Sequence, residues 1–399
     1  MAERVGETMN ALHTNRKVIS AAAILALALI NAPPAPAQES MTTVDRFVPH
    51  VSTVPVNAGE GVELYVKERL SAALEDDIEA GRPGTVSAVL FVHGSLASSI
   101  PVFDLAYKDY SWMDRLAQAG FDTFAMDHTG FGRSPRPAMD DPCNLDDDNQ
   151  KIVMPNPLSA HCEPTYGYTL TNSQSDWDEI DTVVDYIRTL RSVERVSLVG
   201  WSRGGPRAAG YAARHPEKID KLVLLAPAYT PDAPAEPHHP IPEPGLPMRL
   251  MTREMYTQDR WHAGVACDGQ VEPGVEPAVW DALMNVDAVG SGWGPSDGVM
   301  RVSNSPAWGW NRDYAARVTA PTLIMVGEQD FLFDAAEPLY ADLTGTESKY
   351  LIKLECATHY AFWESFHYKR MQDAALEWLT TGKHQGQSQG IRTLRVTHR

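Results

Sequence analysis

Short and almost continuous apolar runs alternate with longer amphipathic stretches along most of the chain. Strands covered by helices on both faces have such runs, whereas a helix that packs on a sheet is apolar on one side only. In residues 176–190 the apolar side chains recur at helical spacing, which predicts a helix against the sheet. Strands that alternate with helices indicate an α/β fold with a parallel sheet. The predicted strands are 86–92, 121–126, 196–199, 221–228, 321–327 and 350–354, and the predicted helices are 110–119, 176–190, 204–213 and 366–379.

Five other segments depart from this alternation. Residues 62–67 alternate apolar and polar side chains, which predicts an edge strand, and the charged residues 73–81 predict a hairpin or a surface loop. Residues 134–175 are too many for an ordinary connection. Residues 229–316 begin with a proline-rich stretch and lose the strand–helix alternation, so we expect an insertion there. Residues 384–399 are polar with little periodicity, and we expect a disordered tail.

The first 37 residues are typical of a secretory signal peptide. A basic start with Arg16 and Lys17 precedes an apolar run over 18–30, and small residues over 35–37 suit a cleavage site. The apolar run is too short to span a bilayer, although an uncleaved anchor is the alternative. We therefore expect an exported, periplasmic or secreted protein without a membrane segment after cleavage. Met9 is an alternative start of translation.

Length and charge restrict the remaining function classes. The chain has 399 residues and a net charge of −18. Once the leader is removed, this length suits one large α/β domain with insertions. A protein that binds nucleic acid or an anionic membrane needs a basic face, so the acidic balance argues against both kinds of partner.

One stretch combines a strand, a sharp turn and a helix. The apolar run over 196–199 leads into Gly200-Trp201-Ser202-Arg203-Gly204, and a segment rich in small residues follows. The glycines two before and two after the serine are needed because a Cβ there would collide with neighbouring backbone. Ser202 is thereby predicted at the top of a sheet with its hydroxyl exposed, in the geometry called a nucleophile elbow.

Two further motifs occur earlier in the chain, each directly after a predicted strand. His93-Gly94 follows the first strand, and Asp127-x-x-Gly130-x-Gly132-x-Ser follows the second. Together with the elbow, in this order, they resemble the α/β-hydrolase superfamily, in the branch that carries a cap, over residues 60–380. This resemblance implies a mostly parallel central sheet flanked by helices, with residues 38–228 and 317–383 as the core and 229–316 as an inserted cap (lid) domain.

A serine nucleophile needs a base and an acid that orients the base. Chain order in this fold is serine, acid, histidine. His359 lies just past the predicted strand 350–354, in a His-x-x-x-x-Glu sequence that looks like the one in the family, and we expect it to be the base. Asp330, after the strand 321–327, matches the family position of the acid, and Asp232 is the alternative.

The oxygen of the tetrahedral intermediate needs backbone N–H donors. The resemblance implies the N–H of Arg203 and that of Ser95, with Leu96 as the alternative to Ser95. We expect His93 to hold its turn through side-chain hydrogen bonds rather than to act in catalysis. Asp127 is likewise expected to be structural. This chemistry requires no cofactor and no metal.

The cysteines permit three pairings, and export makes disulfides permissible. We favour Cys143–Cys162, within one acidic segment, and Cys267–Cys356, which would tie the insertion to the loop of His359. Zinc is disfavoured because no C-x₂-C pair is present. The aspartates near Cys143 match no calcium-binding loop, so a solvated loop closed by a disulfide is the favoured interpretation.

These roles predict an exported serine hydrolase that cleaves a carboxylic ester or lactone through an acyl-enzyme. Serine at the apex excludes a haloalkane dehalogenase or epoxide hydrolase, which need a carboxylate. An acyltransferase, a C–C bond hydrolase or a proline-iminopeptidase-like peptidase on the same triad stay open, as does a non-catalytic binding protein. The substrate-binding candidates are Leu96, Trp201, Trp308 and Trp310. A bulky or aromatic small-molecule substrate would suit them; alternatively, most tryptophans of the insertion form its own core.

Overall fold

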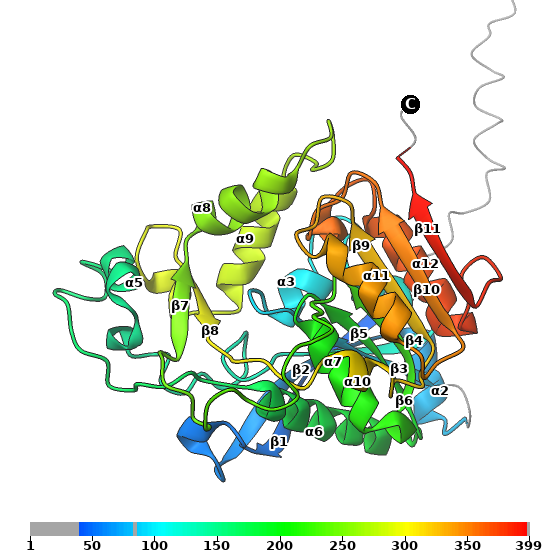
Figure 1. The fold of residues 1–399 in the computed structure, drawn as a ribbon, viewed down its shortest axis with the longest axis horizontal. Helices are drawn as coiled ribbons and strands as arrows, with labels where there is room; N and C mark the ends of the chain where they lie inside the picture. Colours follow the sequence, from blue (N-terminus) through cyan, green and yellow to red (C-terminus); the bar gives the residue numbers. More distant parts are fainter. Residues whose placement is uncertain (1–39, 83–85, 397–399) are drawn as a thin grey trace, which may run out of the picture. The chain divides into compact units, whose positions relative to one another are not determined.

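The predicted parallel sheet is present and extends further at both edges than expected. The computed structural model describes residues 40–82 and 86–396, so the predicted leader lies outside the described residues. Nine strands in the described residues pair in the order β1-β2-β4-β3-β5-β6-β9-β10-β11 (Figure 1). Their bounds are β1 Met41–Val51, β2 Gly61–Ser71, β3 Ser87–Val92, β4 Phe121–Met126, β5 Val196–Trp201, β6 Ile219–Leu225, β9 Thr322–Gly327, β10 Lys349–Leu354 and β11 Gln389–Leu394.

Strands β3 to β6 and β9 to β11 run parallel to one another, whereas β2 is antiparallel to both of its neighbours, β1 and β4. The helices are α2 Ala72–Glu79, α3 Ser99–Phe103, α4 Trp112–Ala117, α5 Asp147–Ile152, α6 Ser173–Arg191, α7 Gly204–Arg214, α8 Arg253–Tyr256, α9 Val275–Asn285, α10 Arg312–Ala315, α11 Phe333–Asp342 and α12 Tyr368–Thr381. Short 3-10 turns are η1 Pro55–Asn57, η2 Pro142–Asn144, η3 Pro216–Lys218, η5 His262–Gly264, η6 Gly290–Gly292 and η7 Ala361–Trp363, and η4 Thr257–Trp261 is a π-helical turn.

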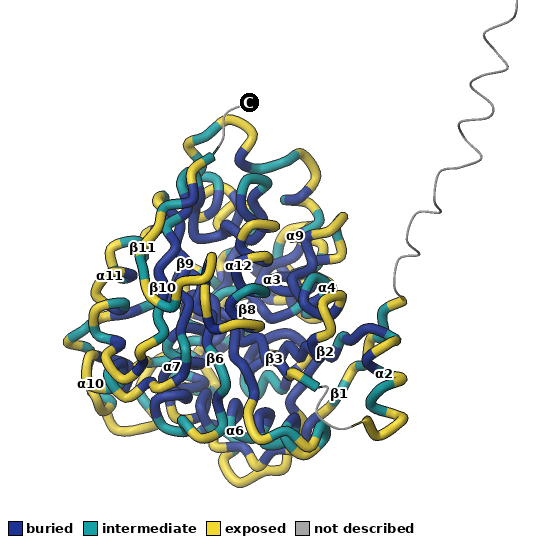
Figure 2. The backbone as a smooth tube through the Cα atoms, turned by 90° about the vertical axis from the view of Figure 1, so that its right-hand side faces the viewer, coloured by how far each residue is buried: buried dark blue, intermediate teal, exposed yellow. Residues whose placement is uncertain are grey.

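Alternate residues of the central strands feed two separate apolar cores. Val89 and Phe91 of β3 face a core with α3, α4 and α12, whereas Leu90 and Val92 face one with α6, α7 and α11. Figure 2 shows the same layering, with the central strands buried and the outer faces of the helices exposed. This two-sided cover explains the continuous apolar runs in the sequence.

Two expectations about the sheet edges were wrong. Residues 62–67 lie in β2, which is covered on its outer side by β1. The expected tail contains β11, which pairs in parallel with all six residues of β10. Both added strands lie at edges and expose one face, so their sequences carry no apolar run.

The charged segment 73–81 is also not a hairpin or a loop. It forms helix α2, which begins where the Ser71 hydroxyl accepts a hydrogen bond from the Leu74 N–H. Leu74 is buried, and most of the other side chains of the helix are partly or fully exposed. An exposed helix of this kind is stabilised by its cap and gives little apolar periodicity.

The chain leaves the sheet between β6 and β9, as expected for the insertion. This part contains α8, α9 and a two-stranded antiparallel sheet of β7 (Met248–Met251) and β8 (Met300–Ser303). It shares a small apolar core with the long segment after β4: Leu145 and Val153 pack with Leu250 and Val299. Figure 1 shows α5 beside β7 and β8. The segment 134–175 is therefore not simply a solvated loop, because part of it is buried under the insertion.

Among residues 40–82 and 86–396, no helix has the length and apolar character needed to cross a bilayer.

Candidate active site

The serine of the Gly-x-Ser-x-Gly motif lies in a strained turn between β5 and α7. Ser202 has φ +57°, a conformation that L-residues rarely adopt, and its N–H donates to the Leu225 carbonyl at 2.9 Å. A Cβ on Gly200 would lie 2.3 Å from the Gly204 carbonyl oxygen, and one on Gly204 would lie 2.2 Å from that of Val92. Both glycines are therefore needed for steric reasons, as the motif predicts.

The imidazole of His359 contacts the carboxylate expected to orient it. His359 Nδ1 lies 3.0 Å from both carboxylate oxygens of Asp330, and both residues are buried. Asp330 follows β9 and His359 follows β10, so the two adjacent parallel strands deliver them to one edge. Nδ1 is thus paired with an acceptor, which leaves Nε2 as the proton-accepting nitrogen.

The alternative acid, Asp232, does not pair with His359. Asp232 is exposed, and its carboxylate lies 3.8 Å from the guanidinium of Arg312. It makes no contact with His359 in the described part of the chain.

The loop of His359 is fixed by hydrogen bonds to buried side chains. The Trp201 indole N–H donates to the His359 carbonyl at 3.0 Å. The Glu364 carboxylate accepts from the Thr358 N–H at 3.0 Å and from the Gln270 side chain at 3.0 Å. Burial raises the pKa of Glu364, and these donors oppose that rise. The last residue of His-x-x-x-x-Glu therefore anchors the residue before the histidine to the insertion.

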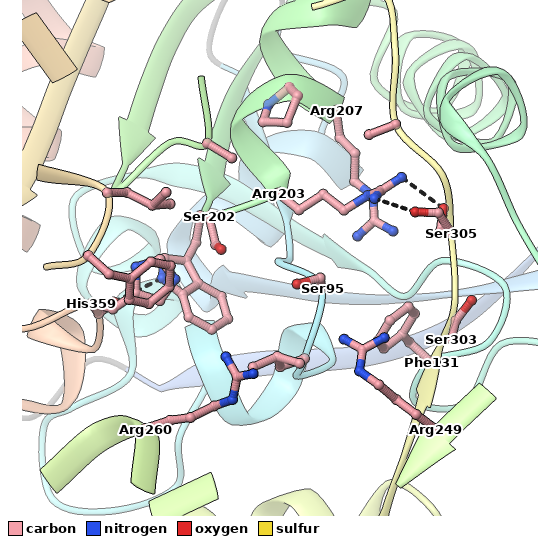
Figure 3. A pocket seen from close by; sticks show the side chains of 17 residues that line it. Ser95, Phe131, Ser202, Arg203, Arg207, Arg249, Arg260, Ser303, Ser305 and His359 are labelled. Carbon is pink, nitrogen blue, oxygen red and sulfur yellow. Dashed lines mark hydrogen bonds between the residues drawn. The ribbon is translucent and has the colours of Figure 1, made fainter. Parts of the chain in front are cut away.

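Ser202 and His359 line one cavity of 370 Å³. Figure 3 shows the Ser202 hydroxyl pointing into this cavity, toward Ser95. The structure records no direct hydrogen bond between the Ser202 hydroxyl and His359, whose ring packs 5.2 Å from that of Trp201. In ligand-free enzymes the nucleophile–base contact is often long and shortens when substrate binds.

Two backbone N–H groups at the cavity have no hydrogen-bond acceptor among the described residues. They belong to Ser95 and Arg203, which both line the cavity beside Ser202. Unpaired N–H groups beside a nucleophile are what an oxyanion hole requires. Their placement agrees with the sequence expectation.

Hydrogen bonds of the His93 ring stabilise the turn that carries Ser95. His93 Nε2 accepts from the His128 N–H at 3.1 Å, so its Nδ1 carries the proton and donates to the Gly94 carbonyl at 2.7 Å. Burial, with the positive charge of Arg207, lowers the pKa of His93 well below its usual value, so the ring stays neutral. His93 thus holds its turn, as expected.

A buried ion pair supports the same turn. Arg207 donates to the carbonyls of His93 and Gly94 at 3.1 and 3.0 Å and to Asp176 at 2.8 Å. Burial opposes ionisation of Asp176, but the charges of Arg207 and Arg203 bring its pKa to about 2. Asp176 is therefore ionised at neutral pH and compensates the buried guanidinium.

The substrate-binding candidates divide into two groups. Leu96 and Trp201 line the cavity, as predicted. The expectation for Trp308 and Trp310 was wrong. The Trp310 ring packs 5.8 Å from the ring of Tyr229 in a sheet core. Trp308 is buried, and its backbone N–H donates to the Ser173 hydroxyl. Trp310 therefore packs in the core of the sheet rather than in a core of the insertion, which was the alternative interpretation.

Sequence reasoning missed two charged residues that the insertion contributes to the cavity. Arg249 lies in β7 and Arg260 lies in η4. Both belong to the insertion and line the cavity. No motif marks them. The only signal was their position in an insertion that covers the sheet edge carrying Ser202.

All four cysteines form disulfides in the expected pairs. Cys143 joins Cys162, and Cys267 of the insertion joins Cys356 at the end of β10. Among the described residues, no group of three or more His, Cys, Asp or Glu side chains is arranged to hold a metal ion. The aspartate run near Cys143 instead supplies Asp146, which caps α5 through the Asn149 N–H.

Comparison with known proteins identifies the family of the chain. The sequence profile of the alpha/beta hydrolase fold matches residues 87–366. AB hydrolase superfamily protein YisY of Bacillus subtilis (strain 168) is 26% identical over 316 residues, covering 75% of this chain and 93% of the relative.

Solved structures align with the chain at low sequence identity. The 2-hydroxy-6-oxo-6-phenylhexa-2,4-dienoate hydrolase BphD from Rhodococcus sp. strain RHA1 aligns with a TM-score of 0.50 and 16% identity, covering 86% of this chain and 100% of that one. An esterase from Exiguobacterium antarcticum aligns with a TM-score of 0.49 and 18% identity, covering 85% and 100%. The profile match spans well over half of the sequence, and the chain accordingly belongs to the α/β-hydrolase family.

Proposed function

We propose that the protein is a serine hydrolase that cleaves a carboxylic ester or lactone through an acyl-enzyme, with Ser202 as nucleophile, His359 as base and Asp330 as orienting acid. The observation that carries the proposal is the convergence of a strained, cavity-facing serine and a carboxylate-paired imidazole on one cavity. Serine at the elbow suits an acyl intermediate, because its hydroxyl becomes an ester that water can cleave.

In this mechanism the Ser202 hydroxyl attacks the substrate carbonyl while His359 Nε2 takes its proton. The resulting oxyanion would accept hydrogen bonds from the free N–H groups of Ser95 and Arg203. His359 then gives the proton to the leaving alcohol, and the acyl group stays on Ser202. A water molecule deprotonated by His359 releases the acid and restores the serine. The Asp330 carboxylate stabilises the imidazolium at each stage.

The cavity wall supports a substrate with a bulky or aromatic apolar part. Leu96, Phe131, Trp201, Phe331 and Leu332 contribute apolar side chains to it. Phe331 is largely exposed and lies 4.4 Å from the His359 ring, so it stands at the rim of the cavity beside the proposed base. Apolar walls with a few polar groups are typical of small-molecule sites.

We also infer that the enzyme acts outside the cytoplasm. The leader-like residues 1–37 and the two disulfides both support export, because disulfides persist in oxidising compartments.

The direct test is hydrolysis of a p-nitrophenyl ester by the purified wild type and by Ser202→Ala. We expect the variant to lose turnover by a factor on the order of 10³ to 10⁶, because acyl transfer needs the hydroxyl. Turnover by Ser202→Ala at the wild-type rate would contradict the assignment. Product analysis with an added alcohol distinguishes release of free acid from transfer of the acyl group.

A further inference from the structure

Two arginines of the insertion bring positive charge to the cavity without an acidic partner. Arg249 and Arg260 both line the cavity of Ser202 (Figure 3). Arg249 donates to the side-chain oxygen of Asn304 at 2.6 Å, a neutral partner. Arg260 is exposed and forms no ion pair or hydrogen bond with the described residues. In Figure 3 both side chains extend from the insertion toward the side of the cavity where Ser95 lies, with the Arg249 guanidinium beside Phe131.

The other two arginines of the cavity are already engaged. Arg203 donates to the Ser305 carbonyl at 2.7 Å and its hydroxyl at 2.8 Å, which ties the insertion to the elbow. Arg207 is paired with Asp176 and two backbone carbonyls. Their donors are largely used within the protein, so Arg249 and Arg260 remain available to a ligand.

The electrostatic environment of Arg249 and Arg260 within the protein is unfavourable for their positive charges. Burial and the positive charge of Arg260 both lower the pKa of Arg249, and no carboxylate offsets them. Asp259 lines an adjoining cavity with both arginines but forms no ion pair with either. The chain as a whole carries a net charge of −18, so an uncompensated basic pair at this point is not explained by a general excess of arginine.

A guanidinium pair of this kind suits a carboxylate. Arginine presents a planar set of donors that matches the two oxygens of a carboxylate, and its weaker hydration makes this pairing favourable at a partly enclosed site. The same cavity is also lined by the apolar side chains of Trp201 and Phe131. The cavity therefore offers an apolar surface and a cationic group within the same space as the nucleophile.

We propose that the substrate of this site is an ester that carries a carboxylate as a second group, and that Arg249 and Arg260 bind that carboxylate while the ester carbonyl lies at Ser202. The proposal rests on the proposed function for the reaction at Ser202, and it adds the chemical class of the substrate. The carboxylate belongs either to the acyl part or to the alcohol part of the ester.

The test compares esters of similar size that carry or lack this carboxylate. On the acyl side, p-nitrophenyl hydrogen glutarate is compared with p-nitrophenyl pentanoate. On the alcohol side, p-carboxyphenyl butanoate is compared with p-acetylphenyl butanoate. We expect kcat/KM of the wild type to favour the anionic ester at least about tenfold in one of the two pairs, because hydrogen bonds to charged groups are strong. Added salt should reduce this preference by screening it.

Arginine variants locate the effect. Arg249→Gln and Arg260→Gln should each lower the anionic-to-neutral ratio of kcat/KM about tenfold, mainly through KM. Arg253→Gln is the matched control, because this substitution removes the same charge from the same insertion. Arg253 is paired with Glu276 outside the cavity. Its ratio should equal that of the wild type. Equal kcat/KM for both members of both pairs in the wild type, or an equal loss in all three variants, would overturn the proposal.

A binding measurement separates this proposal from the proposed hydrolysis. Calorimetry of Ser202→Ala with the same four esters reports affinity without turnover. Tighter binding of an anionic ester by Ser202→Ala, lost in Ser202→Ala/Arg260→Gln, supports the carboxylate site. This conclusion holds even if the wild type hydrolyses none of the esters. Failure of hydrolysis would contradict only the proposed function. Hydrolysis of neutral esters with equal affinity for anionic and neutral forms would refute only the carboxylate site.

Discussion

At the scale of single residues, the geometry of the site depends on a few positions that tolerate no change in side-chain size or hydrogen bonding. Ser202 is held at φ +57° by its neighbours, and the flanking glycines approach backbone so closely that no side chain fits. Asp330 and His359 meet through two 3.0 Å contacts. These contacts give the residue-scale predictions.

The acid can be tested by charge removal. Asp330→Asn should lower kcat on the order of 10³ to 10⁴, because an amide favours the wrong imidazole tautomer and cannot stabilise an imidazolium. Asp232→Asn is the control, since Asp232 is exposed and pairs only with Arg312. Steady-state kinetics at neutral pH checks both. A larger loss in Asp232→Asn than in Asp330→Asn would contradict the assignment of the acid.

Gly204, two residues after Ser202, can be tested by adding one methyl group. Gly204→Ala should destabilise the fold by about 1–3 kcal/mol, because the new Cβ would meet the Val92 carbonyl, which is part of β3 and cannot move aside. Gly167→Ala is the matched control, since nothing lies within 4 Å of its Cβ position. Denaturant unfolding measures both variants. Equal stability of the two variants would contradict the steric conflict between a Cβ at position 204 and the Val92 carbonyl.

At the scale of elements, one disulfide connects the insertion to the loop that carries His359. Cys356 follows β10 directly and precedes His359 by three residues, and its partner Cys267 lies in the insertion. The other disulfide, Cys143–Cys162, lies in the segment that shares a core with β7 and β8. The two bonds therefore stabilise different parts of the molecule.

Removing each pair should have different consequences for activity. Cys267→Ala/Cys356→Ala removes a loop closure of 89 residues and Cys143→Ala/Cys162→Ala one of 19. Chain entropy predicts losses of about 4–5 and about 3 kcal/mol. We expect the first variant also to lose kcat at a temperature where both are folded, because the His359 loop loses its attachment. Thermal melts and kinetics on the two variants decide this, and an equal kcat in both would contradict a role of this disulfide in holding the loop.

The sequence predicted the central elements but not the edges. Strands such as β3 and β9 are covered on both faces, so burial leaves a continuous apolar run that can be recognised. β1 and β11 have one exposed face, and in β11 only Leu394 is buried, so polar side chains dominate their sequences. Pairing with a neighbouring strand fixes these edges, and no pattern within the segment itself records that pairing.

At the scale of the whole molecule, the sequence could predict which side chains meet when each of them belongs to a recognisable motif. It could not predict contacts made by residues outside such motifs. Ser202, Asp330 and His359 each follow a recognisable strand, so fold topology brings them to one edge. Arg249 and Arg260 belong to an insertion whose path depends on packing against residues about a hundred positions earlier, such as Leu145 and Val153. Trp308 and Trp310 were misplaced for the same reason: their composition suits a pocket, but packing buries them against the core.

The acidic chain and its basic cavity together predict how ionic strength acts on the enzyme. Hydrolysis of a neutral ester should vary little with salt, because no charge on the substrate meets Arg249 or Arg260. Hydrolysis of an anionic ester should weaken as salt rises, since screening acts on exposed charges such as Arg260. Rates for both esters across a salt series check this contrast, and the same salt dependence for both would contradict it.

The central claim is that the hydroxyl of Ser202 is activated by His359. The most direct measurement is covalent labelling with a fluorophosphonate followed by peptide mass spectrometry of the wild type, Ser202→Ala and His359→Ala. The account predicts one adduct, on the peptide containing Ser202, that is absent in Ser202→Ala and formed far more slowly in His359→Ala. Labelling of a different residue, or labelling of Ser202 at the same rate without the imidazole, would contradict it.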